Sequence, residues 1–159
     1  MRSKTTNAIG LIVFLGLCYF RLKIGSAVTA TSVGTWYQVL NKASFNPPDG
    51  VFTPVWIVLY FMMAIAGWRV WRHGNSRKIS QALALFALQL GLNFFWSVLF
   101  FGYQRVALAL AEMLVLFLTV VATTVLFWRI DRLAAWLLVP YLLWLVFATV
   151  LTYFVWVLN

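Results

Sequence analysis

Five long stretches of this chain carry almost no charge, and one of them covers the 26 residues between Lys78 and Arg105. A helix that crosses a bilayer needs about 20 mostly apolar residues, because each residue rises about 1.5 Å through a hydrocarbon core about 30 Å thick. Backbone polar groups find no water there, so only helices or closed barrels span it. Barrel strands would show alternating segments of about 10 residues, whereas these stretches are continuous. The pattern predicts an all-α integral membrane protein, a bundle of five transmembrane helices.

The expected helices follow the uncharged stretches and fill most of the chain, so we expect residues 1–159 to form a single transmembrane domain. Their approximate bounds are 7–27, 51–71, 79–102, 106–128 and 133–157. The link after the first helix, about 28–50, is long and contains Trp36 and Phe45. A long loop in a compact domain is typically functional. We therefore expect an aromatic lid, with a short helix around Trp36–Lys42.

Hydrophobic residues make up 64% of the chain, against about half in soluble domains, which leaves no room for a soluble appendage. The net charge of +9 would suit a nucleic-acid partner. However, the basic residues stand at the ends of the apolar stretches, where they orient helices and anchor them to lipid headgroups. We expect no nucleic-acid partner.

The basic residues also predict an orientation, since the side with the N-terminus holds eight Lys or Arg and the opposite side four. In an inner membrane, the positive-inside rule places the N-terminus in the cytoplasm and the lid loop outside. Arg21 and Lys23 are expected to snorkel to the interface, which lets the first helix continue to Ala27. An alternative interpretation is a signal peptide, because Arg2 and Lys4 precede an apolar stretch that ends near small residues.

Three of the expected helices carry aromatic and amide side chains at spacings of three or four, so that each set shares one helical face. The sets are Trp56 and Tyr60; Gln89, Asn93 and Trp96; and Tyr141, Trp144 and Ala148. Burying Gln89 and Asn93 in hydrocarbon is costly unless their amides are bonded. Two interpretations stay open: the amides join helices, worth about 1 kcal/mol each, or they orient a flat aromatic ligand that stacks on the rings.

Several residue types restrict the chemistry. Cys18 is the only cysteine, so an internal disulfide is excluded, and the sole histidine, His73, rules out a bis-histidine haem. No phosphate loop or nucleophile–base set occurs. Glu112 is the only acid within an expected helix; it suits a structural role with Arg105 or another polar partner, or proton coupling in a secondary transporter. Five helices give no even inverted repeat, which weakens the transporter hypothesis.

The third expected helix also presents Ala84, Ala87 and Gly91. Ala87 and Gly91 form a small-xxx-small pair that permits close helix approach. We expect a homodimer through this helix, and packing within one protomer is the alternative.

Many of these residues occur in the order of a known family. The motifs are Trp36-Tyr37 with Leu40 and Lys42, Phe45-Asn46-Pro47-Pro48, Phe52-Thr53-Pro54-Val55-Trp56 with Leu59-Tyr60, Gln89 with Asn93 and Trp96, Phe100-Phe101-Gly102, Pro140-Tyr141-Leu142-Leu143-Trp144 and Phe147-Ala148-Thr149. From Trp36 onward the chain resembles the TspO/MBR family, that is, the tryptophan-rich sensory protein, translocator protein or peripheral-type benzodiazepine receptor family.

The resemblance implies a five-helix bundle, dimeric in bacterial members, whose pocket lies under the first loop. It implies a receptor or sensor that binds porphyrins such as protoporphyrin IX, cholesterol-like sterols and benzodiazepine-type ligands, and that transports them, with no obligatory cofactor or metal. By match to the family's pocket, the expected ligand-binding residues are Trp36, Phe45, Pro47, Trp56, Tyr60, Asn93, Trp96, Tyr141, Trp144, Ala148 and Leu151. An alternative is light- and oxygen-dependent porphyrin breakdown that uses Trp56 and Trp144; otherwise we expect no enzymatic activity.

The chain departs from the family's pattern at three places. Ala43 replaces the proline that usually follows the loop lysine, and Thr152 replaces an asparagine. The sterol-recognition pattern needs a basic residue soon after its tyrosine, and none follows Tyr153. The sequence therefore favours a porphyrin over a sterol.

Overall fold

The structure is a computed structural model that describes residues 3–159. Its helices are α1 (Lys4–Ala30), α2 (Trp36–Val39), α3 (Asp49–Trp71), α4 (Arg77–Ser97), α5 (Val106–Trp128) and α6 (Arg132–Leu158), and α4 continues into a π-helical turn, η1 (Val98–Gly102). Within the described residues, five of these helices are long and apolar enough to cross a membrane. The predicted fold class, an all-α bundle of five spans, is confirmed.

Two helices extend beyond their expected ends because side chains cap them. Ser3 accepts a hydrogen bond from the backbone N–H of Thr6, so that α1 begins at Lys4. Ser76 accepts from the N–H of Ile79 at the start of α4. Each cap satisfies a backbone donor that lacks a partner within its helix. Local polar residues thus set these boundaries, whereas the apolar pattern sets only their approximate place.

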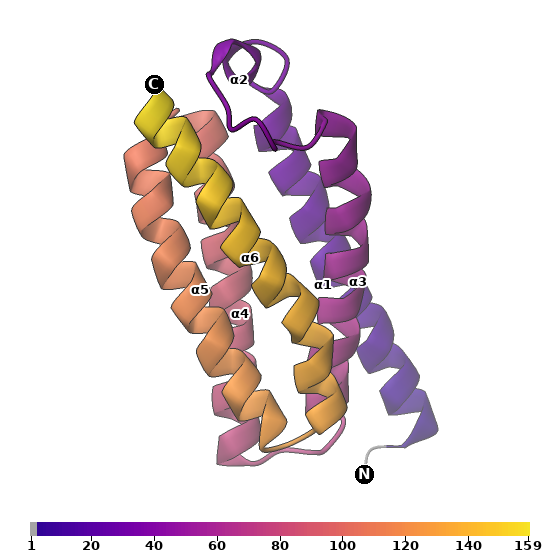
Figure 1. The fold of residues 1–159 in the computed structure, drawn as a ribbon. Coiled ribbons are helices and arrows are strands. Elements are labelled where there is room, and N and C mark those ends of the chain that lie inside the picture. Colours follow the sequence, from indigo (N-terminus) through magenta and orange to yellow (C-terminus); the bar gives the residue numbers. More distant parts are fainter. Residues whose placement is uncertain (1–2) are drawn as a thin grey trace.

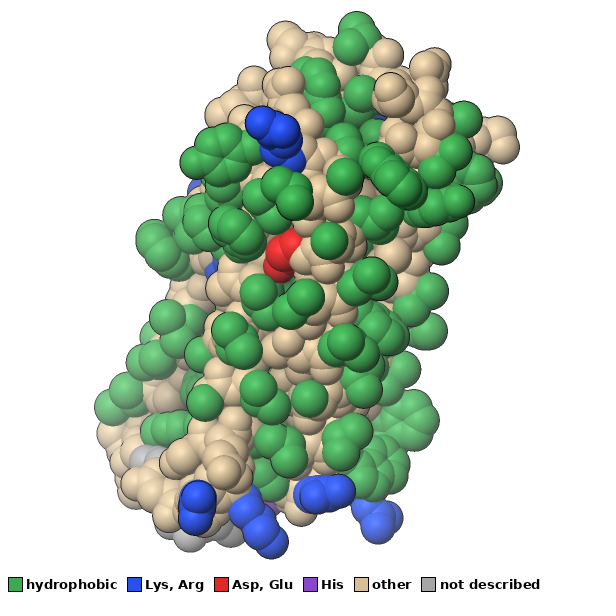
Figure 2. Space-filling view, turned by 90° about the vertical axis from the view of Figure 1, so that its left-hand side faces the viewer, with side chains coloured by type: hydrophobic (Ala, Val, Ile, Leu, Met, Phe, Trp, Pro, Cys, Tyr) green, Lys and Arg blue, Asp and Glu red, His purple; other side chains and the backbone are tan. Residues whose placement is uncertain are grey.

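The five long helices form a ring in the order α1, α3, α6, α5, α4, and α4 with η1 returns to α1 (Figure 1). The loop that carries α2 covers one end of the bundle, beside the end of α6 (Figure 1). The α3–α4 and α5–α6 links lie at the opposite end. On the face that Figure 2 shows, hydrophobic side chains lie along the length of the bundle, and most of the visible Lys and Arg side chains lie near the end with the links. This distribution suits a bundle surrounded by lipid.

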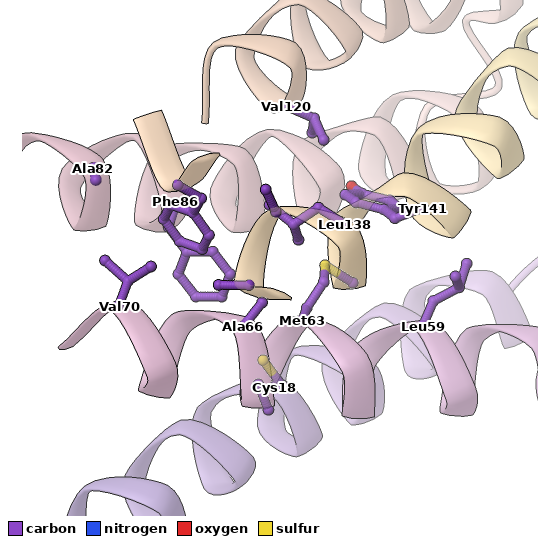
Figure 3. Close-up of a cluster of buried hydrophobic side chains, with 14 of the residues drawn as sticks. Cys18, Leu59, Met63, Ala66, Val70, Ala82, Phe86, Val120, Leu138 and Tyr141 are labelled. Atoms are coloured by element: carbon purple, nitrogen blue, oxygen red, sulfur yellow. The ribbon is translucent and has the colours of Figure 1, made fainter. Parts of the chain in front are cut away.

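The buried core consists of two clusters. The larger one joins side chains of the long helices, and Cys18, Met63, Phe86 and Leu138 point toward one another within it (Figure 3). The smaller one lies next to α2 and contains Tyr37, Leu99, Phe100, Ala109 and Val155. The smaller cluster joins the loop to the ends of α4, α5 and α6.

Two glycines bring α1 and α3 into close contact. A β-carbon at Gly10 would lie 2.2 Å from a ring atom of Trp71, and one at Gly67 would lie 2.7 Å from Phe14. Each glycine therefore receives an aromatic ring from the facing helix.

Charged side chains join α3 to the start of α6. Asp131 accepts from the N–H of Ala134 as the N-cap of α6, and its carboxylate lies 2.9 Å from the guanidinium of Arg69 and 3.2 Å from His73 Nε2. Burial alone would raise the pKa of Asp131, but hydrogen bonds from Ala134, His73 and Arg69, with the charge of Arg69, outweigh it and lower the pKa. These contacts join α3 to α6 at the end of the bundle that carries the α3–α4 and α5–α6 links.

Candidate ligand-binding cavity

A cavity of about 450 Å³ lies within the bundle, lined by residues of the loop and of all five long helices. Its volume falls in the usual range of small-molecule sites, about 300 to 1,000 Å³. The expected binding residues that line it are Trp56, Tyr60, Asn93, Trp96, Trp144, Ala148 and Leu151. Side chains from α3, α4 and α6 thus meet at one space, as their helical spacing indicated.

One wall of the cavity is a group of rings from α3 and α6. The ring centroid of Trp56 lies 5.5 Å from that of Tyr60, 6.2 Å from that of Tyr141 and 6.3 Å from that of Trp144. Trp144 and Tyr141 both meet Trp56 edge to face. Phe52 meets Trp144 in the same way at 5.8 Å. Edge-to-face contacts of this kind stabilise aromatic clusters and fix ring orientation.

A second group of rings belongs to α4 and η1. Trp96 stacks on Phe100 with centroids 5.0 Å apart and planes 16° apart, and Phe101 packs edge-on against both. All rings of both groups except that of Tyr141 belong to residues that line the cavity.

Asn93 is the polar centre of the site and is only 4% exposed. Its Oδ1 accepts hydrogen bonds from the Tyr60 hydroxyl, at 2.5 Å, and from the Arg21 guanidinium. Its Nδ2 donates to the hydroxyl of Tyr141 at 2.9 Å. One amide therefore connects α1, α3, α4 and α6, and it lines the cavity as well. The structure combines both sequence interpretations, because Asn93 joins helices and faces the space for a ligand.

Gln89 behaves differently from Asn93. It is 1% exposed and does not line the cavity. Its Nε2 lies 3.7 Å from the sulfur of Met63, and its Oε1 has no hydrogen-bond partner within the described residues. Gln89 is a packed residue of the core in this structure.

Arg21 corrects the expectation that it snorkels to the interface. Its side chain is 7% exposed, lines the cavity, and donates to Asn93 and to the backbone carbonyl of Leu90. The reason is space: Gly25, one turn later, leaves room for the guanidinium on the inner face of α1. The position of Arg21 within the expected first helix, six residues before its expected end at Ala27, was the available signal.

The lid loop holds its aromatic residues in place by separate contacts. Trp36 lies edge-on to Phe100 at 5.5 Å, and Phe45 lies edge-on to Phe154 at 5.4 Å while 50% exposed. Neither ring lines the cavity, and neither does the half-buried Pro47. Tyr37, which was not among the expected binding residues, does line it.

Tyr37 is 8% exposed and lies under the amine of Lys42, 4.5 Å from its ring centroid. Burial raises the pKa of Tyr37, so its hydroxyl is neutral at physiological pH. Tyr141 was also expected to bind the ligand, but it is fully buried, packs edge to face on Trp56 and is not among the residues that line the cavity. It acts on the site through its contacts with Trp56 and Asn93.

Glu112 is 8% exposed and does not line the cavity. Neither of its carboxyl oxygens has a hydrogen-bond partner among residues 3–159. The partner that the sequence suggested, Arg105, forms no ion pair with it. Because Glu112 lies outside the cavity, the structure gives no support to the hypothesis that its proton is coupled to ligand transport.

Within the part of the chain that the structure describes, no group of three or more His, Cys, Asp or Glu side chains could hold a metal ion. The polar groups of the residues that line the cavity are amides, hydroxyls, indole N–H groups, a guanidinium and the carboxylate of Asp49. These groups can bind an organic ligand by hydrogen bonds and charge.

Comparison with known proteins finds one family and several named relatives that are similar to this chain. The sequence profile of the TspO/MBR family matches residues 8–157. The chain is 41% identical over 135 residues to the tryptophan-rich protein TspO of Archaeoglobus fulgidus, covering 85% of this chain and 87% of that one. It is 45% identical over 118 residues to the tryptophan-rich sensory protein of Cereibacter sphaeroides (74% and 73%). It is 42% identical over 123 residues to the translocator protein of Homo sapiens (76% and 73%).

Proposed function

Because the chain belongs to the TspO/MBR family, we propose that it is a membrane receptor or sensor that binds porphyrins and related flat hydrophobic molecules and moves them in the membrane. The observation that carries this proposal is the cavity of about 450 Å³ between two groups of rings. Relatives are named a sensory protein and a translocator protein. Both names suit a protein that holds a guest within the bilayer.

The chemistry of the cavity supports a flat guest. Trp56 and Trp144 on one side and Trp96 on the other offer ring surfaces for stacking, worth about 0.5 to 1.5 kcal/mol per ring pair beyond area burial. Asn93 supplies a polar contact that can orient the guest. Protoporphyrin IX is the ligand we propose, and the protein needs no resident cofactor for this role.

Titration of protoporphyrin IX into the protein in lipid nanodiscs, followed by porphyrin absorbance, tests the proposal. Replacing Trp56 and Trp144 together by Phe keeps the apolar area but removes both indoles, so we expect at least about fivefold weaker binding. Trp128→Phe is the matched control, because Trp128 is 46% exposed and packs on Trp136 away from the cavity. Equal affinity for all three proteins would place the binding site elsewhere.

A second candidate is light-dependent oxidation of the bound porphyrin. It is favoured by the contact of Trp56 with Tyr60, Tyr141 and Trp144, which gives a continuous set of oxidisable rings beside the cavity. Illumination of the complex in air should then bleach the porphyrin faster than in the Trp56→Phe, Trp144→Phe protein, compared at equal occupancy. Equal bleaching rates would exclude these rings from the reaction.

We also propose a homodimer through α4. Ala84, Ala87 and Gly91 are exposed on its outer face, and a β-carbon at Gly91 would meet no atom within 4 Å. A second copy could therefore approach this face closely. In an inner membrane, the basic end with the links would face the cytoplasm and the α2 loop the outside.

A further inference from the structure

We propose that Arg21 is the binding site for a carboxylate of the guest, so that the protein selects carboxylated porphyrins over neutral ones. This inference rests on the proposed function and specifies the class of ligand. In this arrangement the guanidinium pairs with a carboxylate at the edge of the guest while the rings of the cavity hold its flat body.

Arg21 carries a buried charge. A guanidinium stays protonated in proteins, and a buried charge is costly unless it is paired. All three acids of the chain are described, and the ion pairs of residues 3–159 involve only Asp131. Asp49, the one acid that lines the cavity, is exposed and accepts a hydrogen bond from Gln38 at 2.6 Å. Arg21 therefore has no counter-ion within the protein.

Four groups of the protein contact the guanidinium of Arg21. Of the five N–H groups of a guanidinium, one hydrogen bond goes to Asn93 and one to the carbonyl of Leu90. The rings of Tyr60 and Phe94 lie 5.6 Å and 5.4 Å from its Cζ. All four partners are neutral. They position the guanidinium and leave its charge and further N–H groups for an acceptor with negative charge.

A glycine borders the guanidinium on α1. A β-carbon at Gly25 would lie 2.0 Å from Nη1 of Arg21, so the guanidinium occupies space that a side chain at this position would share. Arg21 and Gly25 both line the cavity, together with Tyr60 and Asn93. A carboxylate in this part of the cavity can accept two parallel N–H bonds from arginine, the strongest arrangement for such a pair.

The test compares protoporphyrin IX with its dimethyl ester, which has the same ring but no charge. Both are titrated into the full chain in nanodiscs at neutral pH, and partition into empty nanodiscs is subtracted. We expect the acid to bind about tenfold more tightly or better, because hydrogen bonds to charged groups are the stronger class. Arg21→Gln should abolish this preference. Lys23→Gln, which removes the same charge from an exposed position on α1, should retain it.

The outcomes are distinct. Equal binding of acid and ester to the unaltered protein overturns the inference and leaves the proposed function in place. A preference that persists in Arg21→Gln, or that disappears in Lys23→Gln, also overturns it. If neither porphyrin binds, the proposed function fails and the inference with it. Should Arg21→Gln not fold, Arg21→Met decides, since it keeps an unbranched side chain but removes the charge and the buried polar group: loss of the preference supports the inference, and an unchanged preference overturns it.

Discussion

The indole ring of Trp71 on α3 occupies the space that a side chain at Gly10 on α1 would need, with Cζ3 2.2 Å from the place of the missing β-carbon. The ring is large, and Phe14 packs on it with the two ring centroids 6.4 Å apart. The contact between α1 and α3 therefore depends on a glycine at this position.

Gly10→Ala should lower the stability of the bundle by about 1 to 3 kcal/mol, the usual cost of forcing extra volume into a packed contact. Thermal unfolding in detergent micelles measures the effect. Gly16→Ala is the matched control on the same helix, because its β-carbon would meet no atom within 4 Å. Equal stability of the two variants would show that α1 does not pack on Trp71.

Asp131 makes the stability of the bundle depend on pH. Its pKa in the folded protein is lowered, so it stabilises the fold above the unfolded value of about 3.9. This contribution is lost as the pH falls through the lower, folded pKa. Asp131→Asn should unfold at a lower temperature than the unaltered protein at pH 7, and the difference should shrink in acid.

Asp131→Ala separates the charge from the helix cap. Asparagine still caps a helix whereas alanine does not, so Asp131→Ala should be less stable than Asp131→Asn by about 1 kcal/mol. The same unfolding measurement at pH 7 gives this order. If the two variants unfold at the same temperature, the hydrogen bond between Asp131 and the N–H of Ala134 does not stabilise α6.

Gly91→Leu should reduce the proposed dimer, because the larger side chain would separate the two α4 helices. The fold of the protomer should be kept, since the position is exposed and empty around its β-carbon. Energy transfer between labelled copies in proteoliposomes measures association. Gly16→Leu, equally free of contacts on α1, should associate as the unaltered protein does; an effect of Gly16→Leu alone would assign the interface to α1.

Single cysteines can determine the orientation, because the native Cys18 is 2% exposed and shielded from reagents. In right-side-out inner-membrane vesicles, a membrane-impermeant maleimide should label Ser44→Cys in the loop. It should not label Asn75→Cys in the α3–α4 link until the vesicles are opened. The reverse pattern would contradict the orientation that the Lys and Arg counts predict.

The sequence predicted the helices well because charged residues bound the apolar stretches, whereas the caps Ser3 and Ser76 moved the starts of α1 and α4. It also predicted that Trp56 and Tyr60 share a face, since helical spacing alone requires it. It could not say how each helix is rotated toward its neighbours, because these helices are apolar on nearly all sides. For that reason it assigned Arg21 to the interface. Tyr37, which lies in the short loop helix α2, was also not among the expected binding residues. The sequence predicted Phe45 in the pocket, whereas the ring packs against Phe154.

The bonds of Asn93 also bear on how occupancy becomes a signal. Its amide is held by Arg21, Tyr60 and Tyr141, so three neighbouring helices share a single junction with α4. A ligand that moves Arg21 away from Asn93 changes the contacts that α1, α3 and α6 share with α4. The change is not confined to the part of the cavity that the ligand contacts. Such a change would be read as slower or faster amide exchange in α1, α3 and α6 at once, and a response confined to one helix would show that the junction transmits nothing.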